Sequence, residues 1–178
     1  MDDDKIIIEE ILKGEVSRFE LLVKKYQQPV YNVIFRISGN VEDAKEITQD
    51  VFVKSYESLR NYKPDYKFFS WLYRIAINSA LMHNKQNRRF VLLSENTERQ
   101  PEFQSTNAEE NEHKYKQLNK ALIELPEKYK SVIVLKYYAA LSYAQIATIT
   151  GIDEKRVKSR LYDGRALLKE LLAKANCI

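Results

Sequence analysis

The segment from Leu141 to Leu161, LSYAQIATITGIDEKRVKSRL, constrains the fold of this chain more than any other. Ser142 followed three residues later by Gln145 has the pattern of a capping box, which predicts that a short helix begins there. A glycine in the middle of the segment ends this helix, and Asp153 is a suitable N-cap for a second one. Two helices joined by so short a turn are typical of a helix-turn-helix.

The second helix of this motif carries its charge away from its apolar side. The apolar positions recur at helical spacing and predict a buried side, with Val157 packed in the angle between the two helices. The basic positions on the other faces are Lys155, Arg156, Lys158 and Arg160. This clustering of cations favours a helix that contacts DNA, and the alternative is an ordinary helical hairpin with a solvated basic face.

The composition also favours a helical protein without bound metal. The 178 residues include four glycines and four prolines, which leaves few turns for a many-stranded sheet. Cys177 is the one cysteine, and no CxxC or HxxxH spacing supplies zinc ligands, so we expect no metal site and no cofactor. No run approaches the roughly 20 apolar residues of a membrane span, so we expect a cytoplasmic protein without membrane insertion.

The formal net charge of +4 is unevenly distributed along the chain. Residues 118–178 hold 11 basic and 6 acidic side chains, whereas residues 94–117 hold 3 basic and 6 acidic ones. Positive charge therefore gathers at the helix-turn-helix end. This distribution favours a polyanionic partner there, with a merely soluble surface as the alternative.

Helical periodicity predicts several helices in residues 1–93. A short helix ends at Gly14. The next helix is expected to break or kink at Pro29, because proline lacks the amide hydrogen that a helix interior requires. A third helix is expected from Glu42 to Leu59, with one apolar side and one polar side.

Aromatic and basic residues are interleaved after this third helix. Residues 61–67, NYKPDYK, form a predicted loop around a proline turn, and the helix after it begins FFSWLYRIAIN. A protein that binds single-stranded nucleic acid needs this combination, because rings stack on bases and cations hold phosphates. A tryptophan at helical spacing is also common in protein cores, so a buried Trp71 is the alternative.

The predicted fold class is all-α, with two small helical domains. Residues 94–112 are acidic and short of apolar side chains, which predicts a flexible linker between domains 1–93 and 113–178. The second domain is expected to have four helices, the last two forming the helix-turn-helix. The helix that follows Pro126 is expected to face its core with Tyr129, Val132, Ile133 and Tyr137.

The order of these segments resembles that of a known family. The segments are FELLVKKY, VEDAKEITQDVFVKSYESL, FFSWLYRIAIN, an acidic linker, ALIELPEKYKSVIVLKY and LSYAQIATITGIDEKRVKSRL. They are similar, in order and spacing, to the extracytoplasmic-function (ECF) sigma factors of bacterial RNA polymerase, group 4 of the sigma-70 family. The resemblance runs from about Phe19 to Leu172. It implies an initiation factor with no enzymatic activity, in which the first domain resembles sigma region 2 and the second resembles sigma region 4.

The resemblance also implies three sets of binding residues. The core polymerase-binding residues would be Asp43, Glu46, Gln49, Asp50 and Phe52. Unpaired bases of the minus-ten promoter element would meet Tyr62, Lys63, Ser70, Trp71, Tyr73, Arg74, Asn78, Lys85 and Arg88. The minus-thirty-five duplex would meet Lys155, Arg156, Lys158, Ser159, Tyr162 and Arg165. Lys155 and Arg156 replace a Gly-Thr pair that is common in the family, and Asp163 replaces a basic residue, so the promoter sequence does not follow from the resemblance.

The implied partners are core RNA polymerase, promoter DNA and an anti-sigma factor, and we expect a monomer when the chain is free. The alternative is a free-standing helix-turn-helix regulator, but a protein that binds only duplex DNA has no use for the aromatic loop. A nucleic-acid enzyme is a third hypothesis, although His83 and His113 flank no nucleophile or carboxylate constellation. The sequence leaves open whether the two domains pack together.

Overall fold

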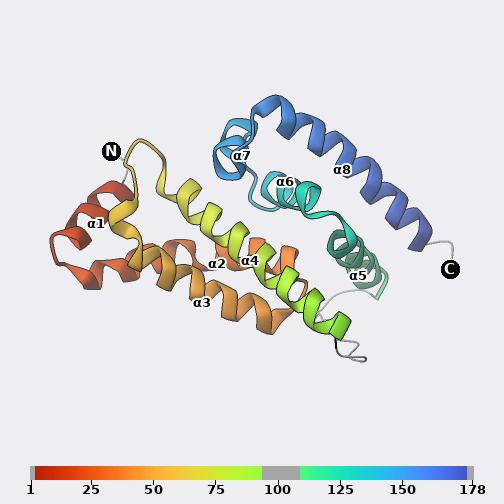
Figure 1. Ribbon diagram of the computed structural model, residues 1–178, viewed down its shortest axis with the longest axis horizontal. Helices are drawn as coiled ribbons and strands as arrows, with labels where there is room; N and C mark the ends of the chain where they lie inside the picture. The colour runs from red at the N-terminus through yellow and green to blue at the C-terminus, as the bar shows by residue number, and fades with distance from the viewer. Residues whose placement is uncertain (1–2, 94–108, 176–178) are drawn as a thin grey trace.

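The computed structural model describes residues 3–93 and 109–175, and these residues form helices joined by short turns (Figure 1). The first half contains α1 (Asp3–Leu12), the 3-10 segment η1 (Val16–Arg18), α2 (Phe19–Ser38), α3 (Val41–Glu57), the 3-10 segment η2 (Leu59–Asn61) and α4 (Phe68–Leu93). The second half contains α5 (Glu109–Glu124), α6 (Glu127–Tyr137), α7 (Tyr143–Thr150) and α8 (Glu154–Ala175). The described residues include no strand, which confirms the all-α prediction. None of the described helices combines the length and apolar character that a membrane crossing requires.

The first half is built around α2, which packs against both α3 and α4. α2 continues through Pro29 instead of breaking there. Leu22 before the proline and Val30 after it are both fully buried, so the same core holds both parts of the helix. Pro29 itself lies on the exposed side, and tertiary packing outweighs the loss of one backbone hydrogen bond.

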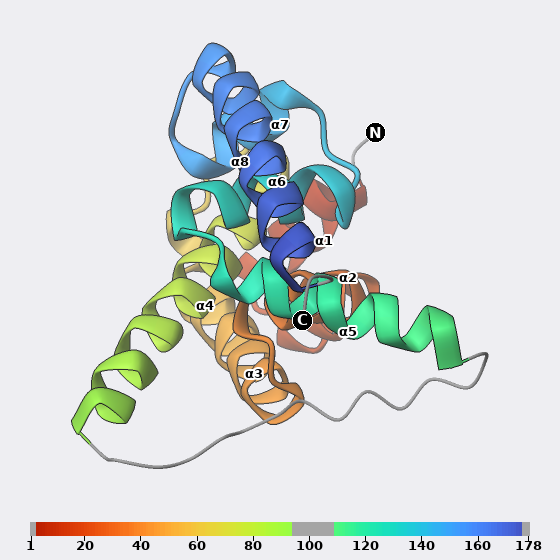
Figure 2. The same cartoon turned by 90° about the vertical axis from the view of Figure 1, so that its right-hand side faces the viewer.

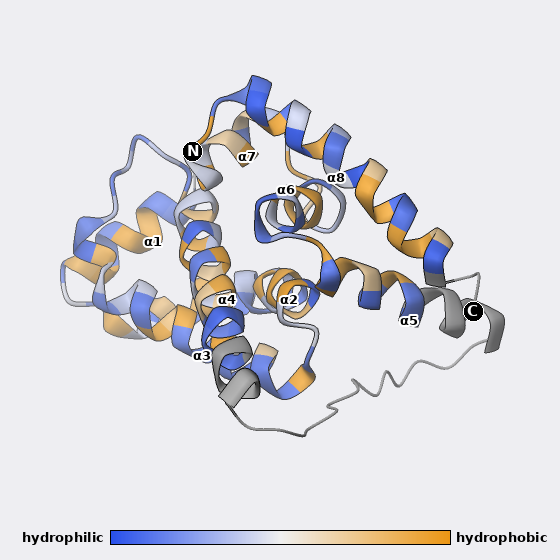
Figure 3. Cartoon of the chain, turned by 45° about the vertical axis from the view of Figure 1, so that its right-hand side comes forward, coloured by the Kyte–Doolittle hydropathy of each residue, from blue (hydrophilic) through white to orange (hydrophobic). Residues whose placement is uncertain are grey.

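The helix-turn-helix forms as the sequence predicts. Ser142 and Gln145 make a reciprocal capping box at the start of α7, and Gly151 ends the helix in the left-handed conformation with φ +71°. The Asp153 carboxylate then accepts the backbone N–H of Arg156 at 2.8 Å and caps α8. Val157 is fully buried between the two helices. Orange and blue residues alternate along α8 in Figure 3, as an amphipathic helix requires.

The prediction for α6 is wrong at Tyr137, whose side chain is 55% exposed. Val132 and Ile133 are buried as expected, and Val134 and Leu135 are buried with them. Nearly every position of α6 in this stretch is covered because α7 and α8 both pack on the helix (Figures 1 and 2). Helical periodicity describes a helix with one buried side, and it fails for a helix that is enclosed by its neighbours.

The two halves of the molecule pack together, which answers the question that the sequence leaves open. α2 contacts α5 and α6, and α4 contacts α7. Gly39 caps the end of α2, and a Cβ atom at this position would lie only 2.3 Å from Cδ1 of Ile123 on α5. Beside it, the Arg36 guanidinium lies 4.5 Å from the ring centroid of Tyr138 and donates to Oδ1 of Asn119. The predicted linker, residues 94–112, lies mostly outside the described residues, but residues 109–112 belong to α5.

Candidate nucleic-acid and polymerase interfaces

The first half of α8 presents the predicted minus-thirty-five residues to solvent. All six are exposed, and among the side chains that the structure describes Tyr162 is the most open large apolar one, at 70%. Val157 and Leu161 are buried, so the helix is anchored by its apolar side and offers its cationic side outward. Helix-turn-helix proteins place this part of the second helix in the major groove.

A tyrosine at the start of α7 brings two lysines together on this face. The Nζ atom of Lys158 lies 5.5 Å from the ring centroid of Tyr143, and Nζ of Lys136, at the end of α6, lies 4.8 Å from the same centroid. Lys136 also donates to the carbonyl of Leu141 at 3.2 Å. The cationic surface therefore extends from α8 to α6. Sequence reasoning missed Lys136, because the turn between α6 and α7 hides its proximity to α8.

The predicted loop after η2 is held by a cluster of aromatic rings. Phe68 is 1% exposed, and its ring centroid lies 5.7 Å from those of Tyr62 and Trp71. The Tyr62 hydroxyl donates to the carbonyl of Tyr66 at 2.5 Å and so closes the loop. Trp71 is half-buried, with one part in this cluster and another part accessible. Trp71 therefore packs against the core without being fully buried, and its contact with a nucleic acid stays a prediction.

The other predicted minus-ten residues divide into buried and exposed sets. Tyr62, Ser70 and Tyr73 are at most 8% exposed, and burial raises the pKa of Tyr73 above its ordinary value. These three residues are therefore part of the protein interior and support the exposed residues around them. The exposed residues, which can reach a nucleic acid in this arrangement or after a rearrangement, are Lys63, Arg74, Asn78 and Lys85. The side chain of Arg88 lies outside the described residues.

Arg74 joins the minus-ten helix to the helix-turn-helix. Its Nε atom donates to the carbonyl of Ile149 at 3.1 Å, and its Nη2 atom donates to the carbonyl of Thr148. Both acceptors belong to the last turn of α7, whose carbonyls have no partner within their own helix and carry partial negative charge. While it caps α7, the Arg74 guanidinium has its Nε and Nη2 atoms engaged by backbone carbonyls, so only its remaining N–H groups are available to a phosphate or a base.

The polar side of α3 is the predicted polymerase-binding surface. Glu46, Gln49 and Asp50 are exposed, as a docking surface requires. Phe52 is only 7% exposed and packs edge-on against Phe19, with 6.5 Å between ring centroids. Its aromatic ring therefore supports the helix from the core side.

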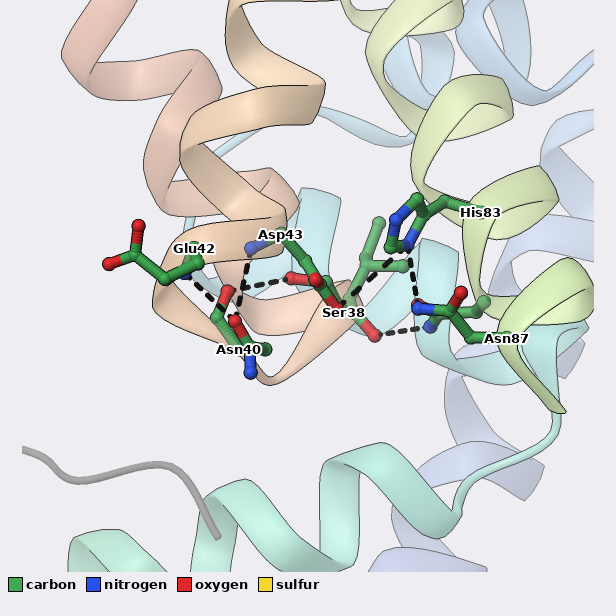
Figure 4. A network of polar contacts seen from close by, with 8 residues as sticks. Ser38, Asn40, Glu42, Asp43, His83 and Asn87 are labelled. Carbon is green, nitrogen blue, oxygen red and sulfur yellow. Dashed lines mark hydrogen bonds and ion pairs between the residues drawn. The ribbon is translucent and has the colours of Figure 1, made fainter. Parts of the chain in front are cut away.

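A polar network fixes the start of α3 (Figure 4). Oδ1 of Asn40 accepts the backbone N–H groups of Glu42 and Asp43 at 2.8 and 3.0 Å. Oδ2 of Asp43 lies 3.9 Å from Nδ1 of His83 on α4, and the same nitrogen lies 3.4 Å from Nδ2 of Asn87. Sequence reasoning treated His83 as an isolated surface residue. The structure brings it into contact with a predicted polymerase-binding carboxylate, which no sequence spacing indicates.

Comparison with known protein families identifies the two halves. The family described as Sigma-70 region 2 matches residues 22–90, and the family described as Sigma-70, region 4 matches residues 115–168. The chain belongs to the sigma-70 family. Its sigma region 2 contains α4 and the aromatic cluster, and its sigma region 4 contains the helix-turn-helix.

Characterised relatives assign this sigma factor to the ECF group. It is 30% identical to the ECF RNA polymerase sigma factor SigW of Bacillus subtilis, over 93% of this chain and 94% of the relative. It is 33% identical to the ECF RNA polymerase sigma-E factor of Escherichia coli, over 91% of this chain and 90% of the relative. The RNA polymerase sigma-H factor of Pseudomonas aeruginosa is 29% identical, over 96% and 94%.

Solved structures share the fold of this sigma factor. CnrH, in complex with the cytosolic domain of CnrY, aligns with a TM-score of 0.73 at 24% identity, over 97% of this chain and 99% of CnrH. RpoE of Bartonella quintana, in complex with the anti-sigma factor NepR, aligns with a TM-score of 0.71 at 21% identity, over 87% of this chain and 96% of RpoE.

The family assignment favours a sigma factor over a free-standing regulator. Sigma factors bind RNA polymerase and are not enzymes, so the chain acts as a transcription initiation factor.

Proposed function

We propose that this sigma factor directs RNA polymerase to promoters through two nucleic-acid surfaces on one chain. Residues 113–178 read the minus-thirty-five element as duplex with α8, and residues 1–93 capture unpaired minus-ten bases beside Trp71. The observation that carries the proposal is the exposed cationic side of α8, on the second helix of a helix-turn-helix in a chain that also has a half-exposed tryptophan on α4.

Recognition of the minus-thirty-five element needs only a few contacts. Side chains such as Arg156, Lys158 and Ser159 reach base edges in the major groove, and each good contact discriminates by about 1–3 kcal/mol. Lys136 and the other cations hold phosphates, which fixes the register of the helix on DNA without reading sequence.

Capture of the minus-ten element needs help from a larger partner. Opening roughly ten base pairs costs on the order of 14 kcal/mol, at about 1.4 kcal/mol per step. Stacking one extruded base on Trp71 returns only about 1–3 kcal/mol. The sigma factor therefore nucleates opening by trapping an extruded base, and core polymerase supplies the rest. The polar side of α3, with Glu46, Gln49 and Asp50, is the surface that we assign to the polymerase.

We infer that the packed arrangement of the two halves opens during this process. While Arg74 caps α7, two of its guanidinium nitrogens donate to carbonyl oxygens, and α7 packs against the minus-ten helix α4. Binding of core polymerase and DNA then separates α4 from α7, and the guanidinium exchanges two carbonyl oxygens for phosphate or base acceptors. A cytoplasmic location follows from this role.

We also infer that an anti-sigma factor is a partner of this chain. The related RpoE of Bartonella quintana is in complex with the anti-sigma factor NepR, and its fold is that of this chain. An anti-sigma factor that keeps α4 against α7 and covers the polar side of α3 would block promoter and polymerase together.

Run-off transcription with purified core polymerase on genomic fragments tests the proposed function. The wild-type chain should yield discrete transcripts. Arg156→Ala combined with Lys158→Ala should abolish them while binding to core polymerase persists. The matched control is Lys169→Ala with Lys174→Ala, which removes two exposed cations from the far end of α8 and should leave transcription unchanged. Equal activity of both double variants would overturn the assignment of α8.

A further inference from the structure

A buried carboxylate joins α1 to α2. Asp4, in the first turn of α1, has a side chain that is only 5% exposed. Its Oδ1 atom accepts from Nζ of Lys25 at 2.6 Å, and its Oδ2 atom accepts from the hydroxyl of Tyr26. Both partners belong to α2. Sequence reasoning predicted neither contact of this carboxylate.

The Tyr26 ring connects this carboxylate to the aromatic cluster. Its centroid lies 5.7 Å from that of Phe68, which in turn lies 5.7 Å from the centroids of Tyr62 and Trp71. Tyr62 and Trp71 complete the cluster at 5.6 Å. α1 also packs against η2, the segment directly before the loop. A continuous series of contacts therefore runs from Asp4 to the half-exposed tryptophan.

Attaching α1 to α2 does not require the buried carboxylate of Asp4. Burying a carboxylate is unfavourable unless it is paired and hydrogen-bonded, and apolar side chains would attach a helix without that cost. Ile8 and Ile11 already do so, at 3% and 6% exposure. What the carboxylate adds is direction, because a hydrogen bond to a charged acceptor fixes the position of the Tyr26 hydroxyl and hence of its ring.

We propose that Asp4 is a positioning residue for minus-ten capture: through Tyr26 and Phe68 it holds Trp71 and Tyr62 in the arrangement that receives an unpaired base. The inference rests on the proposed function. Asp4 does not touch DNA, and Lys25 balances its charge. Without the carboxylate, the Tyr26 hydroxyl loses this acceptor, and the position of the Tyr26 ring against Phe68 is less tightly fixed.

Three variants and a matched control separate positioning from simple attachment of α1. Asp4→Ala removes both contacts of the carboxylate, and Tyr26→Phe removes the hydroxyl but keeps the ring. Asp4→Asn keeps an oxygen acceptor for Tyr26. The control is Glu10→Ala, which breaks the ion pair between Glu10 of α1 and Arg18 of η1, with 3.0 Å between Oε2 and Nε, without touching the aromatic cluster.

The first measurement uses the intrinsic fluorescence of the free chain. Trp71 is the single tryptophan of the sequence, so its emission and its quenching by acrylamide report on the cluster alone. Quenching should rise in Asp4→Ala and Tyr26→Phe and stay at the wild-type level in Glu10→Ala.

The second measurement uses holoenzyme and a fluorescein-labelled single strand that carries the non-template minus-ten segment of a promoter located by run-off transcription. Binding should weaken roughly fivefold in Asp4→Ala and in Tyr26→Phe, as expected for one lost hydrogen bond that orients the site. Asp4→Asn should recover most of the affinity. Affinity for the minus-thirty-five duplex should not change in any variant.

The possible outcomes are distinct. If wild-type holoenzyme does not bind the labelled strand, the proposed minus-ten function fails, whatever Asp4 does. If the wild-type holoenzyme binds the strand, and Asp4→Ala and Tyr26→Phe bind it as tightly as Glu10→Ala does, the positioning role is overturned. Asp4 then only attaches α1 to α2. Tyr26→Phe decides the question on its own should Asp4→Ala fail to fold.

Discussion

Asp153 shows how one side chain sets the start of the DNA-contacting helix. Its carboxylate accepts the backbone N–H of Arg156 at 2.8 Å, and this hydrogen bond, followed by attraction to the Arg156 cation, lowers the pKa of Asp153. A carboxyl group with a lower pKa in the folded than in the unfolded chain stabilises the fold above the unfolded pKa. That stabilisation is lost as the pH falls through the lowered folded value.

The expected result is an Asp153 titration midpoint below the ordinary value of 3.8 in an NMR experiment on the side-chain carboxyl carbon. The cap is then fully formed at neutral pH and is lost only in strong acid. A midpoint at or above 3.8 would mean that the carboxylate does not cap α8 in solution.

Local side-chain chemistry was predictable from the sequence, and contacts between distant residues were not. The capping box of Ser142 and Gln145 and the N-cap Asp153 depend on neighbours within three residues, so the sequence displays them. His83 meets Asp43, and Tyr26 meets Asp4, across separate helices. The spacing of these residues in the sequence predicts neither contact.

α3 is the element on which the polymerase assignment depends. Its buried stripe of Ala44, Ile47, Val51 and Ser55 matches the sequence prediction and turns the acidic side outward. Glu46→Lys combined with Asp50→Lys should weaken binding to core polymerase by roughly tenfold or more, because like charges opposed across an interface are costly.

A pull-down with purified core polymerase measures this effect. The control is Glu9→Lys with Glu20→Lys, which reverses two exposed charges on α1 and α2 and should leave binding unchanged. Equal binding by the two double variants would remove α3 from the interface.

At the scale of elements, the helices were predicted correctly, but one detail in each of two helices was not. Of the break or kink expected at Pro29, the break is absent, because core residues on both sides of the proline hold α2 as a continuous helix. Periodicity placed Tyr137 in the core, although that residue ends α6 beyond the covered stretch. A family resemblance assigns roles to positions without giving their burial, which is why Phe52 and Tyr73 were proposed as contacts and yet lie in the core.

The whole molecule is closed by contacts between its halves, and one glycine offers a direct test of them. Gly39 has φ +76° and lies where a Cβ atom would meet Ile123 of α5 at 2.3 Å. Gly39→Ala should therefore displace the end of the Ile123 side chain and weaken the contact of α2 with α5, and small-angle X-ray scattering measures opening of the molecule as an increased radius of gyration.

Gly151→Ala is the matched control for this experiment. Gly151 also ends a helix with a positive φ, +71°, but no atom lies within 4 Å of the Cβ that it would gain. Both substitutions cost about 1–2 kcal/mol of backbone strain in the left-handed region. Only Gly39→Ala should increase the radius of gyration, and an equal radius in the two variants would mean that the Ile123 side chain accommodates the added methyl group without opening the molecule.

Packing of the two halves was beyond sequence reasoning. Arg74 and its acceptors on α7 are 74 and 75 residues apart, and the guanidinium binds backbone carbonyls, which carry no sequence signal. The sequence indicated a DNA role for Arg74 without indicating that another partner holds it in the closed molecule.

Permanganate footprinting of the holoenzyme on a promoter tests the central claim, which is that region 2 captures an unpaired base while α8 reads intact duplex. Trp71→Ala combined with Asn78→Ala should bind polymerase and retain promoter DNA, yet leave the thymines of the minus-ten segment unreactive. Arg156→Ala with Lys158→Ala should instead lose promoter retention altogether. Thymines that react at the wild-type level in the Trp71 and Asn78 variant would contradict this account.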